Sequence, residues 1–129
     1  MSIKIKTKGC TGHFLERYAY NRKTGKCVDY DVQESCFQGY GNEFETRLEC
    51  LTACNPNSPC LEDNEPQLQH KKRKNPLYYY DSDEDFCFEA SPDVAAKNVW
   101  PNGNLFLSKK RCIRECKPMH KANGKHFSY

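Results

Sequence analysis

RYAYNRKTGKC, residues 17–27, decides the fold of this chain together with NEFETRLECLTAC, residues 42–54, because both patterns return further along it. The corresponding stretches are YYYDSDEDFC, residues 78–87, and NLFLSKKRCIREC, residues 104–116. In each copy two Tyr lie nine and seven residues before a Cys, and a Phe lies six residues before the first of two Cys that are four residues apart. A pattern that repeats with the same spacing indicates two copies of one structural unit.

Each copy predicts a β-hairpin followed by a short helix. The alternating Tyr residues indicate a strand with one buried face, and KTGK, residues 23–26, supplies the first turn. DSDED, residues 81–85, supplies the second turn. Thr46 and Glu49 form a capping box at the start of the first helix, and Ser108 can cap the second. The aromatic residues expected in the core are Tyr18, Tyr20, Phe44, Tyr78, Tyr80 and Phe106.

The composition indicates a secreted, disulfide-stabilised protein. Hydrophobic residues make up 37% of the 129 residues, so the core is thin and needs covalent support. Nine Cys are several times the ordinary usage, which favours an oxidising compartment. A net charge of +3 is weak evidence for a polyanionic partner. No apolar run reaches membrane-spanning length, and residues 1–9 lack the apolar stretch of a signal peptide, which indicates a mature or N-terminally truncated chain.

These motifs resemble the Kunitz domain, the family of bovine pancreatic trypsin inhibitor. The resemblance implies a small disulfide-rich α+β fold of two tandem domains, each a twisted hairpin with a short C-terminal helix. The domains are expected at residues 1–54, with an incomplete N-terminus, and at residues 60–116. The stretch NPNSP, residues 55–59, is the expected linker, and residues 117–129 form a basic tail.

The resemblance also implies the pairing of the cysteines. The second domain lacks the disulfide that connects the binding loop to the second loop of a Kunitz domain. Cys54 is expected to be unpaired in this chain because its partner would precede Met1; an intermolecular bond is the alternative. The implied pairs are Cys10–Cys36, Cys27–Cys50, Cys60–Cys116 and Cys87–Cys112.

In Kunitz inhibitors, the residue after the loop Cys enters the specificity pocket of the protease. The resemblance gives this place to Thr11, although a trypsin-like pocket accepts Lys or Arg. Glu34 and Ser35 stand where the family usually has two Gly. The first domain is therefore expected to contact a protease outside its catalytic pocket, through Thr11, Gly12, His13 and Phe14.

The binding loop of the second domain coincides with HKKRK, residues 70–74. Counting back from Tyr78 places the specificity position at Lys72, whereas counting forward from Cys60 places it at His70. No Cys holds this loop, so we expect it to be mobile and to lie across an acidic exosite. The residues expected to make this contact are Lys71, Lys72, Arg73 and Lys74.

Several alternatives remain open. HKKRK can be a solvated basic loop, but a nucleic-acid role does not suit a secreted chain. Trp100 either fills the space of the absent disulfide or is an exposed anchor for a partner. The DSDED turn lacks the Gly and distal Glu of a calcium loop. Cys112, Cys116 and His120 could suggest zinc, but Pro118 should end the helix before the His, so we expect no metal.

The resemblance to two-domain anticoagulants of hard-tick saliva, similar in role to tissue factor pathway inhibitor, implies a function. We expect a secreted, monomeric serine protease inhibitor that binds a factor X or Xa exosite and blocks factor VIIa–tissue factor. It is expected to be neither an enzyme nor dependent on a cofactor. The alternative is a non-inhibitory Kunitz module that binds heparin or blocks an ion channel. The tail residues expected to contact heparin-like glycosaminoglycan are Lys117, Lys121 and Lys125.

Overall fold

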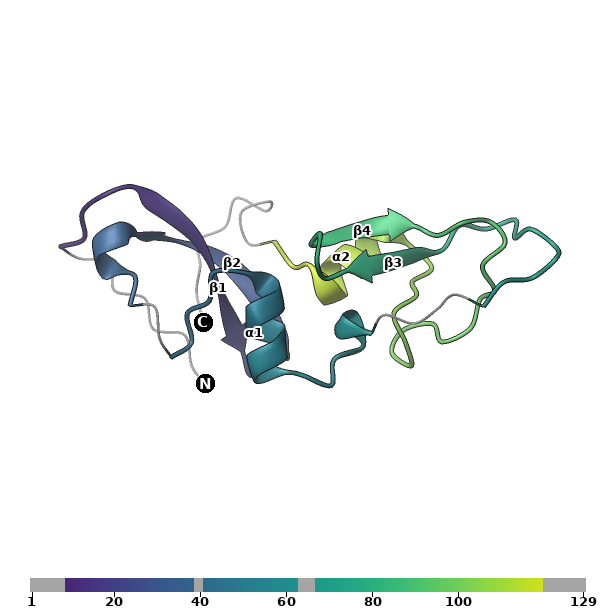
Figure 1. Ribbon diagram of the computed structural model, residues 1–129, viewed down its shortest axis with the longest axis horizontal. Helices are drawn as coiled ribbons and strands as arrows, with labels where there is room; N and C mark the ends of the chain where they lie inside the picture. Colours follow the sequence, from purple (N-terminus) through teal and green to yellow (C-terminus); the bar gives the residue numbers. More distant parts are fainter. Residues whose placement is uncertain (1–8, 39–40, 63–66, 120–129) are drawn as a thin grey trace. The chain divides into compact units, whose positions relative to one another are not determined.

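A computed structural model describes residues 9–38, 41–62 and 67–119 of the chain. It contains two antiparallel hairpins, each followed by an eight-residue helix, as the repeated sequence pattern predicts (Figure 1). The elements are β1 (Phe14–Asn21), β2 (Lys26–Gln33), η1 (Glu34–Cys36), α1 (Arg47–Cys54), η2 (Pro59–Leu61), β3 (Tyr78–Asp81), β4 (Phe86–Glu89) and α2 (Lys109–Cys116).

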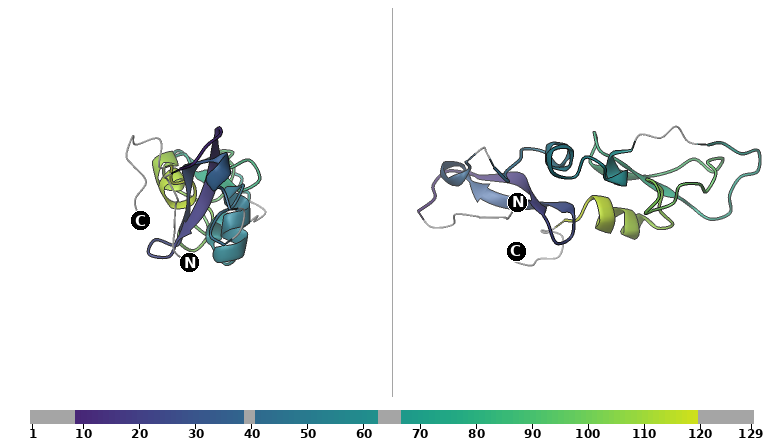
Figure 2. Two further views of the ribbon diagram at one scale, coloured as in Figure 1. Left: turned by 90° about the vertical axis from the view of Figure 1, so that its left-hand side faces the viewer. Right: turned by 90° about the horizontal axis from the view of Figure 1, so that it is seen from below.

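The chain divides into two compact units. Unit 1 holds β1, β2 and α1, and unit 2 holds β3, β4 and α2. The division between Pro56 and Asn57 falls inside the stretch 55–59 expected as a linker. In each unit the helix packs against its own hairpin (Figures 1 and 2).

In unit 1, β1 and β2 pair in a register that sets Tyr18 opposite Asp29 and Tyr20 opposite Cys27. The turn closes through a hydrogen bond from the Gly25 amide to the Asn21 carbonyl, 2.8 Å long. Gly25 has a φ of +73°, a conformation that glycine adopts without steric cost. The hairpin therefore turns where the sequence predicts it.

Both helices begin at the predicted caps. Thr46 Oγ1 accepts a hydrogen bond from the Glu49 amide at 3.1 Å, and Ser108 Oγ accepts one from the Arg111 amide at 3.1 Å. Each cap satisfies one of the amides that a helix start leaves without an intrahelical partner. Ser108 does so although Arg111 replaces the acidic residue of a capping box.

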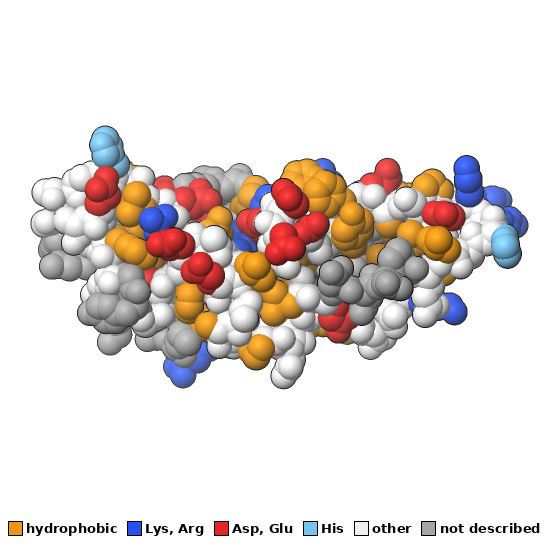
Figure 3. Space-filling model, in the orientation of Figure 1, with side chains coloured by type: hydrophobic (Ala, Val, Ile, Leu, Met, Phe, Trp, Pro, Cys, Tyr) orange, Lys and Arg blue, Asp and Glu red, His pale blue; other side chains and the backbone are white. Residues whose placement is uncertain are grey.

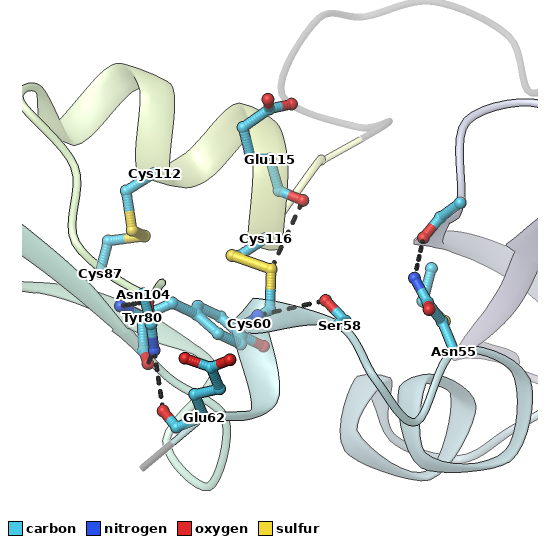
Figure 4. The surroundings of a disulfide bond; sticks show 12 residues. Asn55, Ser58, Cys60, Glu62, Tyr80, Cys87, Asn104, Cys112, Glu115 and Cys116 are labelled. Atoms are coloured by element: carbon cyan, nitrogen blue, oxygen red, sulfur yellow. Dashed lines mark hydrogen bonds between the residues drawn. A yellow bond between two sulfur atoms is a disulfide. The ribbon is translucent and has the colours of Figure 1, made fainter. Parts of the chain in front are cut away.

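An Asn side chain fixes the hairpin in both units in the same way, although Asn104 is buried and Asn42 is only half-buried. Asn42 Oδ1 accepts from the Tyr20 amide at 2.8 Å, and its Nδ2 donates to the Tyr20 carbonyl at 2.9 Å. Asn104 repeats these bonds with the amide and carbonyl of Tyr80, at 2.9 and 2.7 Å. The Nδ2 of Asn104 also donates to the Glu62 carbonyl, at 3.2 Å (Figure 4).

Four disulfides connect these elements, in the same pairs that the resemblance implies. Cys54 takes part in none of the four. In unit 2 the Cys60 amide also donates to Ser58 Oγ at 3.1 Å, beside the bridge to Cys116 (Figure 4). The pairs are Cys10–Cys36, Cys27–Cys50, Cys60–Cys116 and Cys87–Cys112.

The aromatic core is smaller than the alternation predicts. Tyr80 and Phe106 are fully buried, but Tyr18, Tyr20, Tyr78 and Phe44 are only half-buried. Among the described residues of unit 1, the buried tyrosine is Tyr30, which packs with Ala19 and Val32. Burial, assisted by the neighbouring Glu43, raises the pKa of the Tyr30 phenol well above its usual value.

Candidate functional site

The loop of unit 1 is bridged by Cys10–Cys36 and bonded along its length to the segment that begins with η1. Thr11 exchanges two bonds with Ser35: its amide donates to Ser35 Oγ at 2.6 Å, and its carbonyl accepts from the Ser35 amide at 3.1 Å. His13 likewise donates to the Glu34 carboxylate at 3.2 Å and accepts from the Glu34 amide at 3.0 Å. A covalent bridge and four hydrogen bonds therefore fix the conformation of this loop.

Glu34 and Ser35, which stand where Kunitz domains usually have two Gly, both take part in these hydrogen bonds. The Ser35 hydroxyl and the Glu34 carboxylate both accept hydrogen bonds from main-chain amides, and Gly at these positions would have no side chain to accept them. Gly12 has a φ of +95°, and a Cβ at that position would lie 3.1 Å from the Glu34 Cβ. The departure from the family pattern thus maintains the rigidity of the loop.

The four candidate contact residues of unit 1 all lie on the surface. Phe14 is 69% exposed, and Thr11, Gly12 and His13 are exposed beside it. The short Thr11 side chain cannot bring a positive charge to the acid of a trypsin-like pocket. The loop is therefore held by a disulfide and hydrogen bonds, but Thr11 does not offer the basic side chain that such a pocket binds.

The HKKRK loop of unit 2 is bonded to the segment that follows β4. The Arg73 amide donates to the Pro92 carbonyl at 2.8 Å, and the Gln69 amide donates to Asp93 at 2.8 Å. The Ala95 amide donates to the Gln67 carbonyl at 2.6 Å. The sequence predicts a loop without a constraint because no Cys holds it; the structure shows main-chain hydrogen bonds there instead.

The charged side chains of this loop do not all face the same way. His70, Lys71, Lys72 and Lys74 are exposed, whereas Arg73 is half-buried. Figure 3 shows basic side chains gathered at the end of unit 2 that carries this loop. Four of the five residues are therefore available to a partner, and Arg73 is turned toward the protein.

Trp100 packs on unit 2 and does not extend fully into solvent. Its ring stacks on Phe106 with centroids 5.2 Å apart, and its amide donates to the Leu105 carbonyl at 2.7 Å. The indole borders a hollow of about 360 Å³ whose lining includes three cations of the α2 region. Among the described residues, no ring contact or hydrogen bond joins Trp100 to the HKKRK loop. The cations are Lys110, Arg111 and Arg114.

An exposed aromatic cluster on the β3–β4 hairpin was not predicted. Tyr79, Phe86 and Phe88 are 37%, 41% and 36% exposed, and the two Phe rings lie 4.8 Å apart. The ammonium groups of Lys109 and Lys117 lie over the Phe86 ring at 5.0 and 5.4 Å. The alternation that places Tyr80 in the core places Tyr79 on the opposite face, so the signal was present in the sequence.

The structure offers no support for the zinc pattern. Cys112 and Cys116 are both consumed in disulfides, and His120 lies outside the described residues, as do Lys121 and Lys125 of the tail. Within the described ranges, no three His, Cys, Asp or Glu side chains are grouped as metal ligands. No helix in these ranges is long and apolar enough to cross a membrane.

The thiol of Cys54 is not set up as a nucleophile. It is half-buried in the last turn of α1, and burial raises its pKa above the usual value. A raised pKa lowers the fraction of thiolate, which is the reactive form of cysteine, at neutral pH.

Known proteins resemble this chain over most of its length. Residues 2–55 match the model of the Kunitz/bovine pancreatic trypsin inhibitor domain. Haemaphysalin of Haemaphysalis longicornis is 33% identical over 119 residues, which are 90% of this chain and 70% of the relative. Ixolaris of Ixodes scapularis is 33% identical over 101 residues, 77% of this chain and 56% of the relative. The NMR structure of ixolaris, determined with its factor X interaction, is 29% identical, covers 84% of this chain and 87% of that one, and has a TM-score of 0.35. The chain belongs to the Kunitz/bovine pancreatic trypsin inhibitor domain family.

Proposed function

We propose that the chain is a secreted anticoagulant of two tandem Kunitz domains that binds a coagulation serine protease through surfaces outside the catalytic pocket. Residues 1–54 and 60–116 are the two domains. The repeated cap, disulfide and Asn contacts of the two units support a common origin of their folds. Haemaphysalin and ixolaris, which both share 33% identity with the chain, support the comparison with inhibitors of tick saliva.

The observation that carries this proposal is the arrangement of Lys71, Lys72 and Lys74. These side chains are exposed on a hydrogen-bonded loop, which we propose to be the counterpart of the binding loop of a Kunitz domain. Three ammonium groups on one short segment complement an acidic surface, and such contacts raise the association rate and its salt dependence. The partner we propose is factor X or Xa, because the relative ixolaris interacts with factor X.

Unit 1 has a separate role in this proposal. Its rigid loop exposes Thr11, His13 and Phe14, of which Phe14 offers the largest apolar surface. An exposed aromatic side chain on a rigid loop contributes to an interface without a large loss of conformational entropy. We propose that this loop contacts factor VIIa–tissue factor beside its catalytic pocket, in a complex that factor X joins.

The test measures binding and inhibition with charge-matched variants. The triple variant Lys71→Gln, Lys72→Gln, Lys74→Gln removes three charges from the loop. The control Arg22→Gln, Lys23→Gln, Lys110→Gln removes three exposed charges elsewhere. We expect factor X affinity to fall about tenfold or more in the loop variant, from three rim contacts of roughly 0.5 kcal/mol each, and far less in the control.

Inhibition of factor VIIa–tissue factor should require added factor X. If the unchanged protein binds neither factor X nor factor Xa at micromolar concentration, the anticoagulant proposal is wrong. If it binds and the loop variant binds equally well, the exosite contact lies elsewhere on the molecule.

A further inference from the structure

The loop of unit 2 lacks the disulfide that holds the corresponding loop of unit 1. In its place, the guanidinium group of Arg73 donates to main-chain carbonyls of the segment that follows β4. Nε donates to Val94 at 2.6 Å, and Nη2 donates to Ser91 at 2.7 Å and to Ala90 at 3.4 Å. Nη1 donates to the carbonyl of Asn75 at 2.5 Å, which closes the loop onto itself.

These carbonyls belong to a segment that is anchored in the core. Leu77, Ala90 and Val94 form a buried cluster and are 2%, 8% and 4% exposed. The Ala90 amide also donates to the Leu77 carbonyl at 2.8 Å. By bonding the carbonyls of Ala90 and Val94, the Arg73 side chain connects the exposed loop to this buried apolar cluster of unit 2.

Arginine is suited to this task and lysine is not. The planar guanidinium carries five donors in a fixed fork, so one side chain can reach several carbonyls at once. Hydrogen bonds from a charged donor are stronger than neutral ones. A lysine ammonium is a compact charge on a flexible stem, so it could not bond at once to all the carbonyls that the guanidinium group reaches together.

We propose that Arg73 is a positioning residue that holds residues 67–75 onto residues 90–95, as Cys10–Cys36 holds the loop of unit 1. The basic run then has two functions in five residues. Arg73 faces inward and fixes the main chain, and Lys71, Lys72 and Lys74 face outward in a defined arrangement. The role of the three lysines rests on the proposed function; the role of Arg73 does not depend on any partner.

A matched pair of substitutions separates position from charge. Arg73→Lys keeps the charge and the trypsin site but removes the guanidinium fork. Lys72→Arg also keeps the charge and the site, but it changes a side chain that is exposed. We expect trypsin to cleave after residues 71 and 72 about tenfold faster in Arg73→Lys than in the unchanged chain, because cleavage follows the population of the open loop. Lys72→Arg should be cleaved after Lys71, where the residue at the cleaved bond is the same, at the unchanged rate.

Hydrogen exchange measures the same opening without a protease. The amides of Gln69, Arg73 and Ala95, which join the two segments, should exchange about tenfold faster in Arg73→Lys. The amides of Tyr80 and Cys112, in the hairpin and the helix, should keep their protection, and peptide mapping should still find Cys60–Cys116 and Cys87–Cys112. Retention of these signals shows that the variant is folded.

Two results would overturn the inference. Equal cleavage and exchange in Arg73→Lys and the unchanged chain would mean that a positive charge alone suffices at this position. Faster exchange at Tyr80 and Cys112 to the same degree as at Arg73 would mean that Arg73 supports the whole unit and not the loop. Neither result bears on factor X binding, so the two proposals fail independently.

Discussion

Replacement of Asn104 by Ala should destabilise unit 2 much more than the equivalent replacement of Asn42 destabilises unit 1. Asn104 is 8% exposed and makes three hydrogen bonds, to the amide and carbonyl of Tyr80 and to the carbonyl of Glu62. Asn42 makes the two equivalent bonds to Tyr20, which is only half-buried. Water can therefore replace the lost side chain in unit 1 but not in unit 2.

The magnitude follows from the groups left without partners. Asn104→Ala leaves the amide and the carbonyl of the buried Tyr80 unpaired, and each costs about 1–3 kcal/mol, so we expect a loss of about 3 kcal/mol. For a unit of this size, such a loss lowers the melting temperature by about 12–24 °C. Asn42→Ala should cost about 1 kcal/mol, because its stranded groups remain in reach of solvent.

The assay uses the single Trp of the chain as a probe of unit 2. Trp100 stacks on Phe106, two residues from Asn104, so its emission reports the unfolding of this unit. Asn104→Ala should shift the Trp100 transition to lower temperature, and Asn42→Ala should leave it in place while lowering the transition of unit 1 in far-ultraviolet circular dichroism. If Asn104→Ala moves the Trp100 midpoint no further than Asn42→Ala does, the buried Asn contact is not what stabilises the hairpin.

Three further substitutions test other features. Tyr30→Phe should reduce the loss of stability that occurs above pH about 10. Because the pKa of the Tyr30 phenol is raised in the folded state, the phenol stabilises the fold fully below its unfolded pKa, and this contribution is lost as the pH rises. An alkaline titration monitored by circular dichroism will measure the change. If the alkaline midpoint does not move upward, Tyr30 is not the group that titrates. Gly103→Ala should lower the melting temperature of unit 2, because its Cβ would lie 2.4 Å from the Asn98 carbonyl oxygen; an unchanged Trp100 emission and midpoint would contradict this clash. Thr11→Arg places a basic side chain at the proposed specificity position, on a loop that a disulfide and hydrogen bonds already hold, and we expect measurable trypsin inhibition. Cleavage after residue 11 without inhibition would show that the loop conformation is not substrate-like.

The parts of the fold that depend on neighbours in sequence were predictable. Thr46 and Ser108 cap helices because their hydroxyls reach amides three residues on, and Gly25 turns the hairpin because it tolerates positive φ. The disulfide pairs followed from the family resemblance and not from spacing alone. The helices and hairpins therefore required no knowledge of the tertiary structure.

The orientation of Arg73 could not be predicted in this way. It stands between Lys72 and Lys74 with no local feature that marks it as different. Its partners are carbonyls of Ala90, Ser91 and Val94, which hairpin β3–β4 brings close from about twenty residues away. The burial of Tyr30 and the stacking of Trp100 on Phe106 likewise depend on contacts between segments that the sequence pattern does not relate.

The two loops combine constraint and side-chain charge in opposite ways, and this supports the proposal that both contact a protease outside its catalytic pocket. The unit 1 loop is covalently bridged, but the residue that we propose for its specificity position is Thr11. The unit 2 loop has the lysines that a trypsin-like pocket accepts, but its constraint is a set of hydrogen bonds. A disulfide persists through local opening, whereas hydrogen bonds are lost in it, so a lysine inserted into a catalytic pocket from this loop would be cleaved whenever the loop opened. Lysines laid across an acidic surface meet no nucleophile, and for that role the Arg73 contacts provide sufficient order.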